Sequence, residues 1–382
     1  MKRVIIYVPG SVDFLGGGER LAWSLARKLR RNGFSAALSG TLPRSPSQQS
    51  REGVPKADGP EVPVVETKYR RYSCIKWPRF LAQDLPAVEC LDLSTTHLIL
   101  IHRFPPRRFV RMCLRANVSV VYMVHGISLK PVRNRCILVR LLQAYHWTIL
   151  KINRKVYSQP GVRFQCLTPS SASWIIQAGV PSNRISVIPN AIDATPYQLG
   201  SPKDFQVIFI GRMQKVHKGL KLLSEIIRLC SKQLPDVEFC VIGDGPGLPW
   251  LRSTLSGLHN YRLLGATTDA QKVSELARSS VMLVTSTIEP FSIVLLEGGM
   301  SGLLVLSTPV EGSDFVLGLD PSLGHILDSR AETFVQDIAR AFLRWKDCPQ
   351  EYMEEKMSRR TRFMERFDED IMVQKYSLMI KQ

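Results

Sequence analysis

The most informative absence in this chain is a stretch of about a hundred residues, between Asp92 and Asp193, that contains no acidic side chain. The same stretch holds fourteen Lys and Arg residues, and the whole chain carries a formal net charge of +18 at pH 7. A field of one sign attracts anionic partners, which include a phospholipid surface, a lipid diphosphate and nucleic acid. Nucleic acid is the weakest of these, because no recognition motif or row of interleaved aromatic residues accompanies the basic ones. We therefore expect an anionic membrane surface as a partner, and no nucleic acid.

Paired cysteines and long apolar runs are also lacking. The eight cysteines are scattered without a C-x-x-C pair, which predicts reduced thiols and neither a disulfide framework nor a zinc site. The apolar run after Met1-Lys2-Arg3 has only about five residues before Pro9, too few for a signal peptide. No other run approaches the roughly 18 to 20 residues of a membrane span. These absences predict a soluble, cytoplasmic protein, and the basic stretch adds the expectation that it is peripheral on the inner face of the plasma membrane.

Regularly spaced apolar runs predict the fold class. Strands are expected at 3–8, 34–39, 97–101, 118–124, 164–168, 206–210, 237–242, 280–285 and 303–306, with helical patterns between them. Near-continuous apolar strands indicate parallel sheets that are covered on both faces. At 382 residues the chain suits two such domains, so we predict an α/β protein with two doubly wound, Rossmann-like domains. The segment 41–60 is rich in Pro, Ser and Gly and predicts a mobile loop.

Two carboxylates eight positions apart are the strongest positive signal. Residues 289–297 read E-P-F-S-I-V-L-L-E and follow the apolar run at 281–284. Because Pro290 suits a first helical turn, a helix is expected to begin near it, with Glu289 at its N-terminus and Glu297 about two turns along on nearly the same face. Both carboxylates can then contact one ligand. A pair of sugar hydroxyls and a ribose diol each need a bidentate acceptor, and a carboxylate supplies one. Taken alone, the pair reads more readily as two solvated glutamates on a surface helix.

The surrounding motifs change that interpretation. Three segments, P-D-V-E-F-C-V-I-G-D-G-P-G (235–247), Y-R-L-L-G-A-T-T-D (261–269) and the run at 279–308, stand in the order and spacing typical of one enzyme family. Upstream, G-R-M-Q-K-V-H-K-G (211–219), V-I-P-N-A-I-D (187–193) and G-G-G-E-R-L-A-W-S-L-A-R-K-L (16–29) match the same family. Together these segments resemble the retaining glycosyltransferases of family 4, which have the GT-B fold and include bacterial enzymes of cell-surface polysaccharide and lipopolysaccharide assembly.

The resemblance implies a domain plan. The two Rossmann-like domains would face each other across a cleft, with an acceptor-binding domain at 1–195 and a nucleotide-sugar-binding domain at 196–364. The final helix, 365–382, would return to the first domain. Transfer would run from a nucleotide-diphosphate sugar to a glycan or lipid-linked acceptor, with retention at the anomeric carbon.

The resemblance also implies roles for individual residues. Glu289 would hold the hydroxyls of the donor sugar and Glu297 the ribose. Arg212 and Lys218 would stabilise the diphosphate, and the backbone of Gly16 and Gly17 would close over it. The catalytic set would be Glu289, His125, Arg212 and Lys218; the nucleotide-sugar set would be Gly16, Gly17, Arg212, Lys218, Glu289, Phe291, Ser292 and Glu297. His102 would face the acceptor or simply end a strand.

No metal is expected at this site. Metal-dependent glycosyltransferases use a D-x-D pair after a strand, and the only match here, at 368–370, lies in a helical pattern near the C-terminus. The cations that stabilise the leaving diphosphate must then come from the protein, and Arg212 and Lys218 are the candidates. We expect no cofactor beyond the donor substrate.

Departures from the family pattern keep other functions open. Pro290-Phe291-Ser292 stands where Gly-Phe-Gly is usual, Gly298-Gly299 replaces Ala-Met, and the loop at 309–316 differs as well. A sugar-nucleotide epimerase or hydrolase on this fold, or a non-catalytic sugar-nucleotide-binding protein, are the alternatives. The basic segment 134–155 is either an amphipathic helix on a membrane or a helix packed on a sheet.

Overall fold

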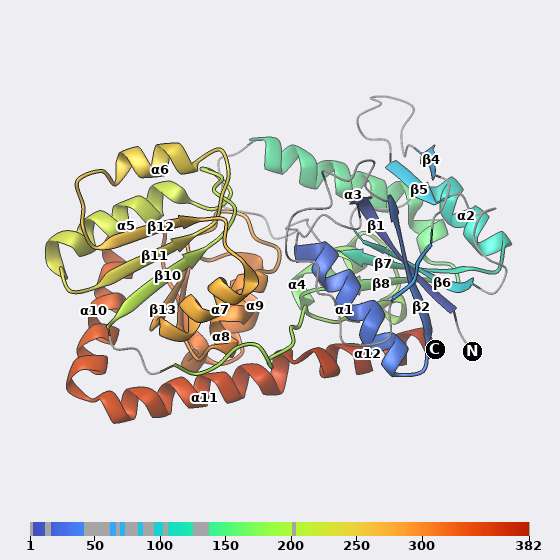
Figure 1. Ribbon diagram of the computed structural model, residues 1–382. Coiled ribbons are helices and arrows are strands. Elements are labelled where there is room, and N and C mark those ends of the chain that lie inside the picture. Colours follow the sequence, from blue (N-terminus) through green and yellow to red (C-terminus); the bar gives the residue numbers. More distant parts are fainter. Residues whose placement is uncertain are drawn as a thin grey trace. The chain divides into compact units, whose positions relative to one another are not determined.

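The chain forms two compact units in the computed structural model (Figure 1). The structure describes residues 3–11, 17–41, 62–65, 69–72, 83–86, 95–101, 106–124, 137–200 and 204–381. Unit 1 comprises Met1–Asn190 and Asp370–Gln382, and unit 2 comprises Ala191–Glu369. The chain therefore crosses between the units twice, and unit 1 is discontinuous in sequence.

Unit 1 is built on a parallel sheet with the strand order β3-β2-β1-β6-β7-β8-β9. Its strands are β1 (Arg3–Ser11), β2 (Ser35–Thr41), β3 (Val64–Val65), β6 (Thr95–Ile101), β7 (Ser119–Val124), β8 (Val162–Cys166) and β9 (Ile185–Val187). A separate antiparallel pair is formed by β4 (Tyr69–Tyr72) and β5 (Gln83–Pro86). The helices are α1 (Gly17–Arg31), α2 (Arg107–Arg115), α3 (Ile137–Tyr157), α4 (Pro169–Gln177) and α12 (Glu369–Lys381).

Helices cover the sheet of unit 1 because both faces of its strands are apolar. Side chains of α2, α3 and α4, such as Phe109, Leu150 and Ile175, join one core cluster with alternate residues of the strands. On α1, Leu25 and Leu29 are fully buried, and Lys28 of the same helix pairs with Asp370 of α12 at 2.6 Å. The C-terminal helix is therefore part of unit 1.

Unit 2 contains a parallel sheet with the strand order β12-β11-β10-β13-β14-β15. Its strands are β10 (Gln206–Ile210), β11 (Glu238–Ile242), β12 (Tyr261–Gly265), β13 (Val281–Val284), β14 (Leu304–Ser307) and β15 (Gly324–Ile326). Its helices are α5 (Leu220–Gln233), α6 (Leu248–Thr254), α7 (Asp269–Arg278), α8 (Ile293–Met300), α9 (Glu311–Gly318), α10 (Ala331–Asp347) and α11 (Pro349–Phe367). The strand order reverses direction between β10 and β13, which is where doubly wound sheets bind ligands.

The two faces of this sheet are covered by different helices. Residues of α5, α6 and α10 form one cluster with Val207, Val241 and Leu283. On the opposite face, α8 packs against β13 and α11. The predicted fold class, two doubly wound Rossmann-like units, is therefore confirmed.

All nine expected strands are present, and the strands that the sequence did not reveal are short or lie at sheet edges. In β12, four of the five residues are half-buried and the remaining one, Leu264, is exposed, because an edge strand has a neighbour on one side alone. The expected start of a helix near Pro290 is wrong: α8 begins at Ile293, after Ser292 in an extended conformation. The segment before it is held by the ring of Phe291, which contacts Phe315 and Phe367. The loop expected at 41–60 lies almost entirely outside the described residues.

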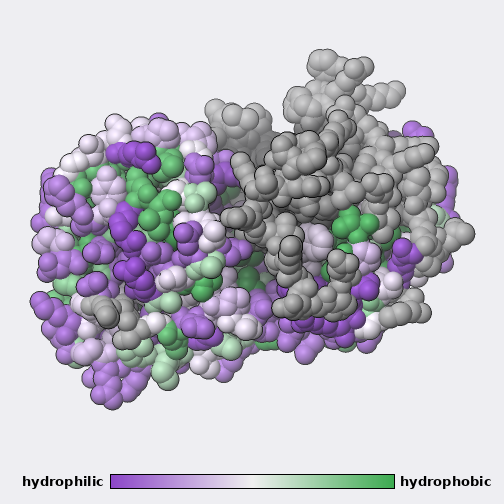
Figure 2. Space-filling model, viewed as in Figure 1, coloured by the Kyte–Doolittle hydropathy of each residue, from purple (hydrophilic) through white to green (hydrophobic). Residues whose placement is uncertain are grey.

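The two interpretations of the segment 134–155 are resolved over its second half. In α3, Ile149, Leu150, Val156 and Tyr157 are buried in the core cluster of unit 1, whereas Lys151 and its exposed neighbours face outward. From residue 144 onward this is a helix packed on the sheet. No helix within the described residues is both long and apolar enough to cross a membrane. Figure 2 shows a largely hydrophilic surface over the coloured part of unit 2, with smaller hydrophobic areas between.

Candidate functional site

The candidate site lies in unit 2 at the carboxyl ends of β10 and β13, where two loops meet. The loop 211–219 follows β10, and the loop 285–292 follows β13. Thr285 Oγ1 donates to the carbonyl of Lys218 at 2.8 Å, and the Thr287 backbone N–H donates to the carbonyl of His217 at 3.0 Å. Thr287 Oγ1 also donates to the carbonyl of Val216 at 2.6 Å. These bonds fix one loop against the other.

Gly219 permits this close approach. It caps α5 in a left-handed conformation with φ of +60°, and a Cβ atom there would lie 1.9 Å from the carbonyl oxygen of Thr285. A residue with a side chain would strain the backbone and push the loops apart. In the segment 211–219, Gly219 thus fixes the position of Lys218, the residue before it.

Lys218 and Glu289 meet across the two loops. Lys218 Nζ donates to Glu289 Oε2, and their side chains are 22% and 15% exposed. Arg212, at the start of the first loop, is exposed and makes no ion pair or side-chain hydrogen bond with the described part of the chain. The structure therefore brings two of the predicted site residues into contact and leaves a third, the cation Arg212 on the same loop as Lys218, without an ion-pair partner among the residues that the structure describes.

Glu297 is held differently, inside the unit. It is 6% exposed, and its Oε1 accepts from the Tyr197 hydroxyl at 3.0 Å and from Lys272 Nζ at 2.5 Å. Its Oε2 has no hydrogen bond with any described residue. Lys272 and Tyr197 were missed by the sequence analysis, since they lie 25 and 100 residues away and no local pattern links them to Glu297.

The N-terminus of α8 presents unused backbone donors. Ser292 is its N-cap but makes no side-chain capping bond. Phe291 is buried, and neither its N–H nor that of Ser292 donates to another group of the described residues. Uncapped N–H groups at a helix N-terminus attract negative charge. The site thus combines a carboxylate, two cations and an anion-binding helix end.

The unusual Gly298-Gly299 pair has a packing explanation. A Cβ atom on Gly299 would lie 2.4 Å from the ring of Phe363 on α11, and one on Gly298 would lie 3.0 Å from Cβ of Met282 on β13. Small residues are needed on this side of α8 because it is pressed between a strand and a helix. This departure from the family pattern therefore reflects packing.

The predicted site residues of unit 1 are only partly described. Gly17 is the first residue of α1. Gly16, His102 and His125 lie outside the described residues, although His125 directly follows β7 in sequence. Within the described residues, no group of three or more His, Cys, Asp or Glu side chains is placed to hold a metal ion.

Comparison with known proteins places the chain in a family. Residues 204–343 match the family model described as glycosyl transferases group 1, and residues 15–195 match that of glycosyltransferase family 4. The chain is a glycosyltransferase of family 4. The resemblance drawn from the motifs is thereby confirmed.

This family 4 glycosyltransferase shares limited sequence with curated relatives. It is 34% identical over 150 residues to the gpi3 subunit of phosphatidylinositol N-acetylglucosaminyltransferase of Schizosaccharomyces pombe. The aligned segment covers 37% of this chain and 33% of the relative. It is 29% identical over 148 residues to the phosphatidyl-myo-inositol mannosyltransferase of Mycobacterium tuberculosis, with 37% and 39% covered. The chain thus spans about a third of the length of the first of these relatives.

Solved structures agree on the fold. HepE from Anabaena in complex with UDP and glucose matches with a TM-score of 0.69 over 100% of both chains, at 17% identity. At this identity the likeness concerns the fold alone. It identifies the two units as the GT-B fold.

Proposed function

We propose that this glycosyltransferase transfers a sugar from a nucleoside diphosphate sugar to a lipid-linked acceptor, with retention at the anomeric carbon and without a metal ion. The observation that carries the proposal is the Lys218–Glu289 pair at the point where the sheet of unit 2 reverses its strand order. A sugar nucleotide presents hydroxyls to a carboxylate and a diphosphate to cations, and both kinds of group stand here.

The proposed roles follow from the geometry of the site. Arg212 is exposed and uncompensated, so it can contact the diphosphate, while Lys218 remains beside Glu289. The free N–H groups before α8 add donors for the same charge. The Oε2 atom of Glu297 is left to accept from a ribose hydroxyl.

The chemical step needs little beyond this arrangement. As the bond between the anomeric carbon and the phosphate oxygen breaks, that oxygen gains negative charge, which the fixed cations stabilise. The same oxygen takes the proton of the acceptor hydroxyl, whose oxygen forms the new bond on the face that the diphosphate left. Configuration is thereby retained, and positioning supplies most of the catalysis.

A donor screen tests the first half of the proposal. UDP-, GDP- and ADP-sugars are compared by thermal shift, with UDP-glucose and UDP-N-acetylglucosamine first, since HepE was solved with UDP and UDP-glucose. A donor at a hundred times its dissociation constant should stabilise the protein by about 2.7 kcal/mol. Turnover of that donor should then survive EDTA, and loss of activity that Mn²⁺ or Mg²⁺ restores would contradict the metal-free mechanism.

Product analysis separates transfer from the alternatives. Without acceptor, an epimerase would convert the donor and a hydrolase would release free sugar, while a binding protein would do neither even with acceptor present. Transfer predicts a glycolipid product only when both substrates are supplied. An acceptor panel should begin with phosphatidylinositol, the lipid in the names of two relatives, and include lipid-linked and lipopolysaccharide-type glycans.

We further propose that unit 1 binds anionic membrane, where such an acceptor resides. On α2, Arg107, Arg108, Arg111 and Arg115 are all exposed, and the helix has no acidic residue. Each basic residue near an anionic surface contributes about 1 kcal/mol of binding, and salt screens the attraction. A peripheral location on the cytoplasmic face of the membrane follows from this proposal.

Vesicle co-sedimentation tests membrane binding. The protein should sediment with phosphatidylglycerol vesicles at low salt, less at high salt, and not with neutral vesicles. Reversing charge at Arg108, Arg111 and Arg115 to Glu should release it, whereas the matched reversal of Lys221, Lys232 and Arg252 in unit 2 should not. Equal loss in both triple variants would mean that only net charge matters.

A further inference from the structure

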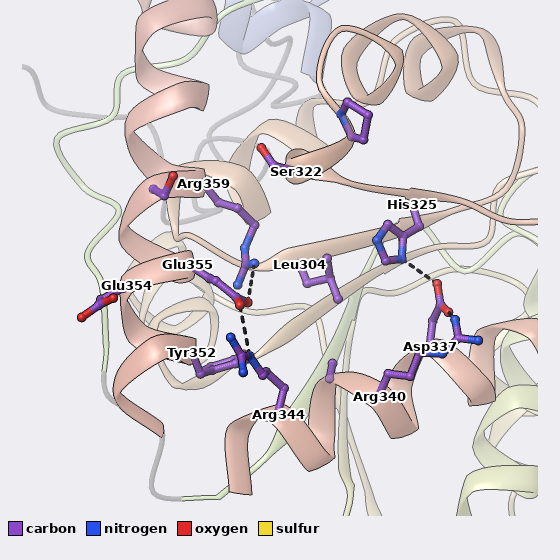
Figure 3. Close-up of a pocket in the computed structure, with 13 residues that line it drawn as sticks. Leu304, Ser322, His325, Asp337, Arg340, Arg344, Tyr352, Glu354, Glu355 and Arg359 are labelled. Carbon is purple, nitrogen blue, oxygen red and sulfur yellow. Dashed lines mark hydrogen bonds and ion pairs between the residues drawn. The ribbon is translucent and has the colours of Figure 1, made fainter. Parts of the chain in front are cut away.

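Unit 2 contains a pocket away from the candidate site. It has a volume of about 530 Å³ and lies between α10, α11 and the starts of β14 and β15 (Figure 3). Leu304, the first residue of β14, and Ser322, just before β15, mark the amino ends of these strands, whereas the candidate site follows the carboxyl ends of β10 and β13. The volume is within the range of small-molecule sites. No role proposed above uses this pocket.

Arg359 carries an unused donor in this pocket. The side chain extends from α11 into the pocket, and the residue is only 6% exposed (Figure 3). Its Nε donates to the carbonyl of Gly302 at 3.1 Å, and its Nη1 lies 3.7 Å from Glu355 Oε2. Its Nη2 is buried and has no hydrogen-bond partner among the described residues. A buried guanidinium nitrogen without an acceptor is unfavourable and would be satisfied by an incoming oxygen atom.

The carboxylates around the pocket are already shared between cations. Asp337 accepts from His325 Nδ1 and from Arg340 Nη1, both at 2.6 Å. Glu355 accepts from Arg344 Nε at 3.2 Å as well as facing Arg359. Each of these two carboxylates therefore already has two partners, and Arg344 also pairs with Glu351, so Arg359 Nη2 is the donor left for an incoming group. Leu304, Pro321 and Ala341 supply apolar surface beside it.

We propose that this pocket binds a small organic anion, with an oxyanion head on Arg359 Nη2 and an apolar body against Leu304, Pro321 and Ala341. Phosphate and carboxylate heads share this chemistry. A small molecule fits better than a protein segment, because the free donor is buried.

Calorimetry on the full-length protein tests the site. The measurement uses the Arg212→Gln, Lys218→Gln double variant, so that probe binding at the proposed donor site does not contribute to the heat. The outcome is therefore independent of the proposed function. The probes are hexyl phosphate, hexanoate and inorganic phosphate. We expect saturable binding of hexyl phosphate or hexanoate, which identifies the head group, and at least tenfold weaker binding of inorganic phosphate, which lacks the apolar body.

Variants locate the binding. Arg359→Met should weaken it at least tenfold. Ser358 is exposed on the pocket wall, so Ser358→Trp should weaken probe binding by filling the entrance of the pocket. This variant keeps the test valid if Arg359→Met fails to fold. Arg330→Met is the matched control, since Arg330 is exposed and pairs with Asp328 outside the pocket. Absence of saturable binding at millimolar probe, or an affinity unchanged in Ser358→Trp and any folded Arg359→Met, would overturn the proposal.

Discussion

The two units share one architecture but treat charge in opposite ways. In unit 2, cations are held by carboxylates of neighbouring elements, as in Lys218–Glu289, Lys272–Glu297 and Arg262–Glu275. In unit 1, residues 93–192 contain no acid at all. One acid that unit 1 does use, Asp370 beside Lys28, comes from the far end of the chain. A charged side chain that is held in an ion pair has a fixed position and can serve in catalysis, whereas a charged side chain without an ion-pair partner can bind an outside partner.

Breaking the Lys218–Glu289 pair should have the largest effect. Glu289→Gln removes the negative charge but keeps the shape, and we expect kcat to fall by about 10²- to 10³-fold, as for other preorganised charges. Lys218→Met should cause a similar loss, and the double variant should lose less than the two effects combined, because the residues act as a unit.

The control for this experiment is Glu225→Gln, which alters an exposed glutamate near Lys221 on α5. It should leave kcat unchanged, and circular dichroism should show that all variants are folded. If kcat of Glu289→Gln stays within threefold of the wild type, the pair has no catalytic role.

Lys356 is a buried cation of unit 2 that has no ion-pair partner among the described residues, and it sharpens the comparison. Its side chain is fully buried, and Nζ donates to the carbonyls of Gly200 at 3.0 Å and Ser279 at 2.9 Å, without a carboxylate partner. Burial, with repulsion from Arg359, lowers the pKa of Lys356 from 10.5 to about 8. The unfolded chain keeps this proton up to a pH near 10.5, so the contribution of Lys356 to the free energy of unfolding should rise between pH 8 and 10.5, by on the order of 3 kcal/mol in total.

Urea unfolding of the protein between pH 7.5 and 9 measures this effect. The upper limit matters because burial raises the pKa of Cys230 and Cys240 to about 12, and these thiols reduce stability once unfolded cysteines ionise. The free energy of unfolding of the wild type minus that of Lys356→Met should rise with pH over this range, because the cysteines contribute equally to both. The same difference for Lys221→Met, an exposed control, should stay constant. A difference for Lys356→Met that does not change with pH would show that Lys356 does not lose its proton in this range.

The smallest effect is expected for the stability of unit 1. Arg111→Glu on α2 changes an exposed side chain, so the free energy of unfolding should change by no more than about 0.5 kcal/mol. Denaturant midpoints of wild type and variant measure this change. A loss well above 1 kcal/mol would show that this arginine has a structural role in unit 1 and would contradict the contrast between the units.

Sequence patterns were sufficient for the fold because long buried strands carry continuous apolar runs. They also placed Lys218 and Glu289 in one candidate site, since both follow strands whose carboxyl ends share one sheet edge, but they did not indicate that the two side chains form an ion pair. They did not indicate that Tyr197 and Lys272 hold Glu297, because such contacts depend on how α7, α8 and the start of unit 2 pack. Edge strands such as β15 were missed because three residues, one buried and two exposed, are too few to give a periodic signal.

The discontinuity of unit 1 sets an order for its folding during synthesis. The buried residues of α12, among them Val373, Tyr376 and Ile380, belong to unit 1 but leave the ribosome after all of unit 2. Domains that are continuous in sequence usually fold from the N-terminus onward. Here the continuous second unit can finish first, while the first must wait, incomplete, until α12 has been synthesised.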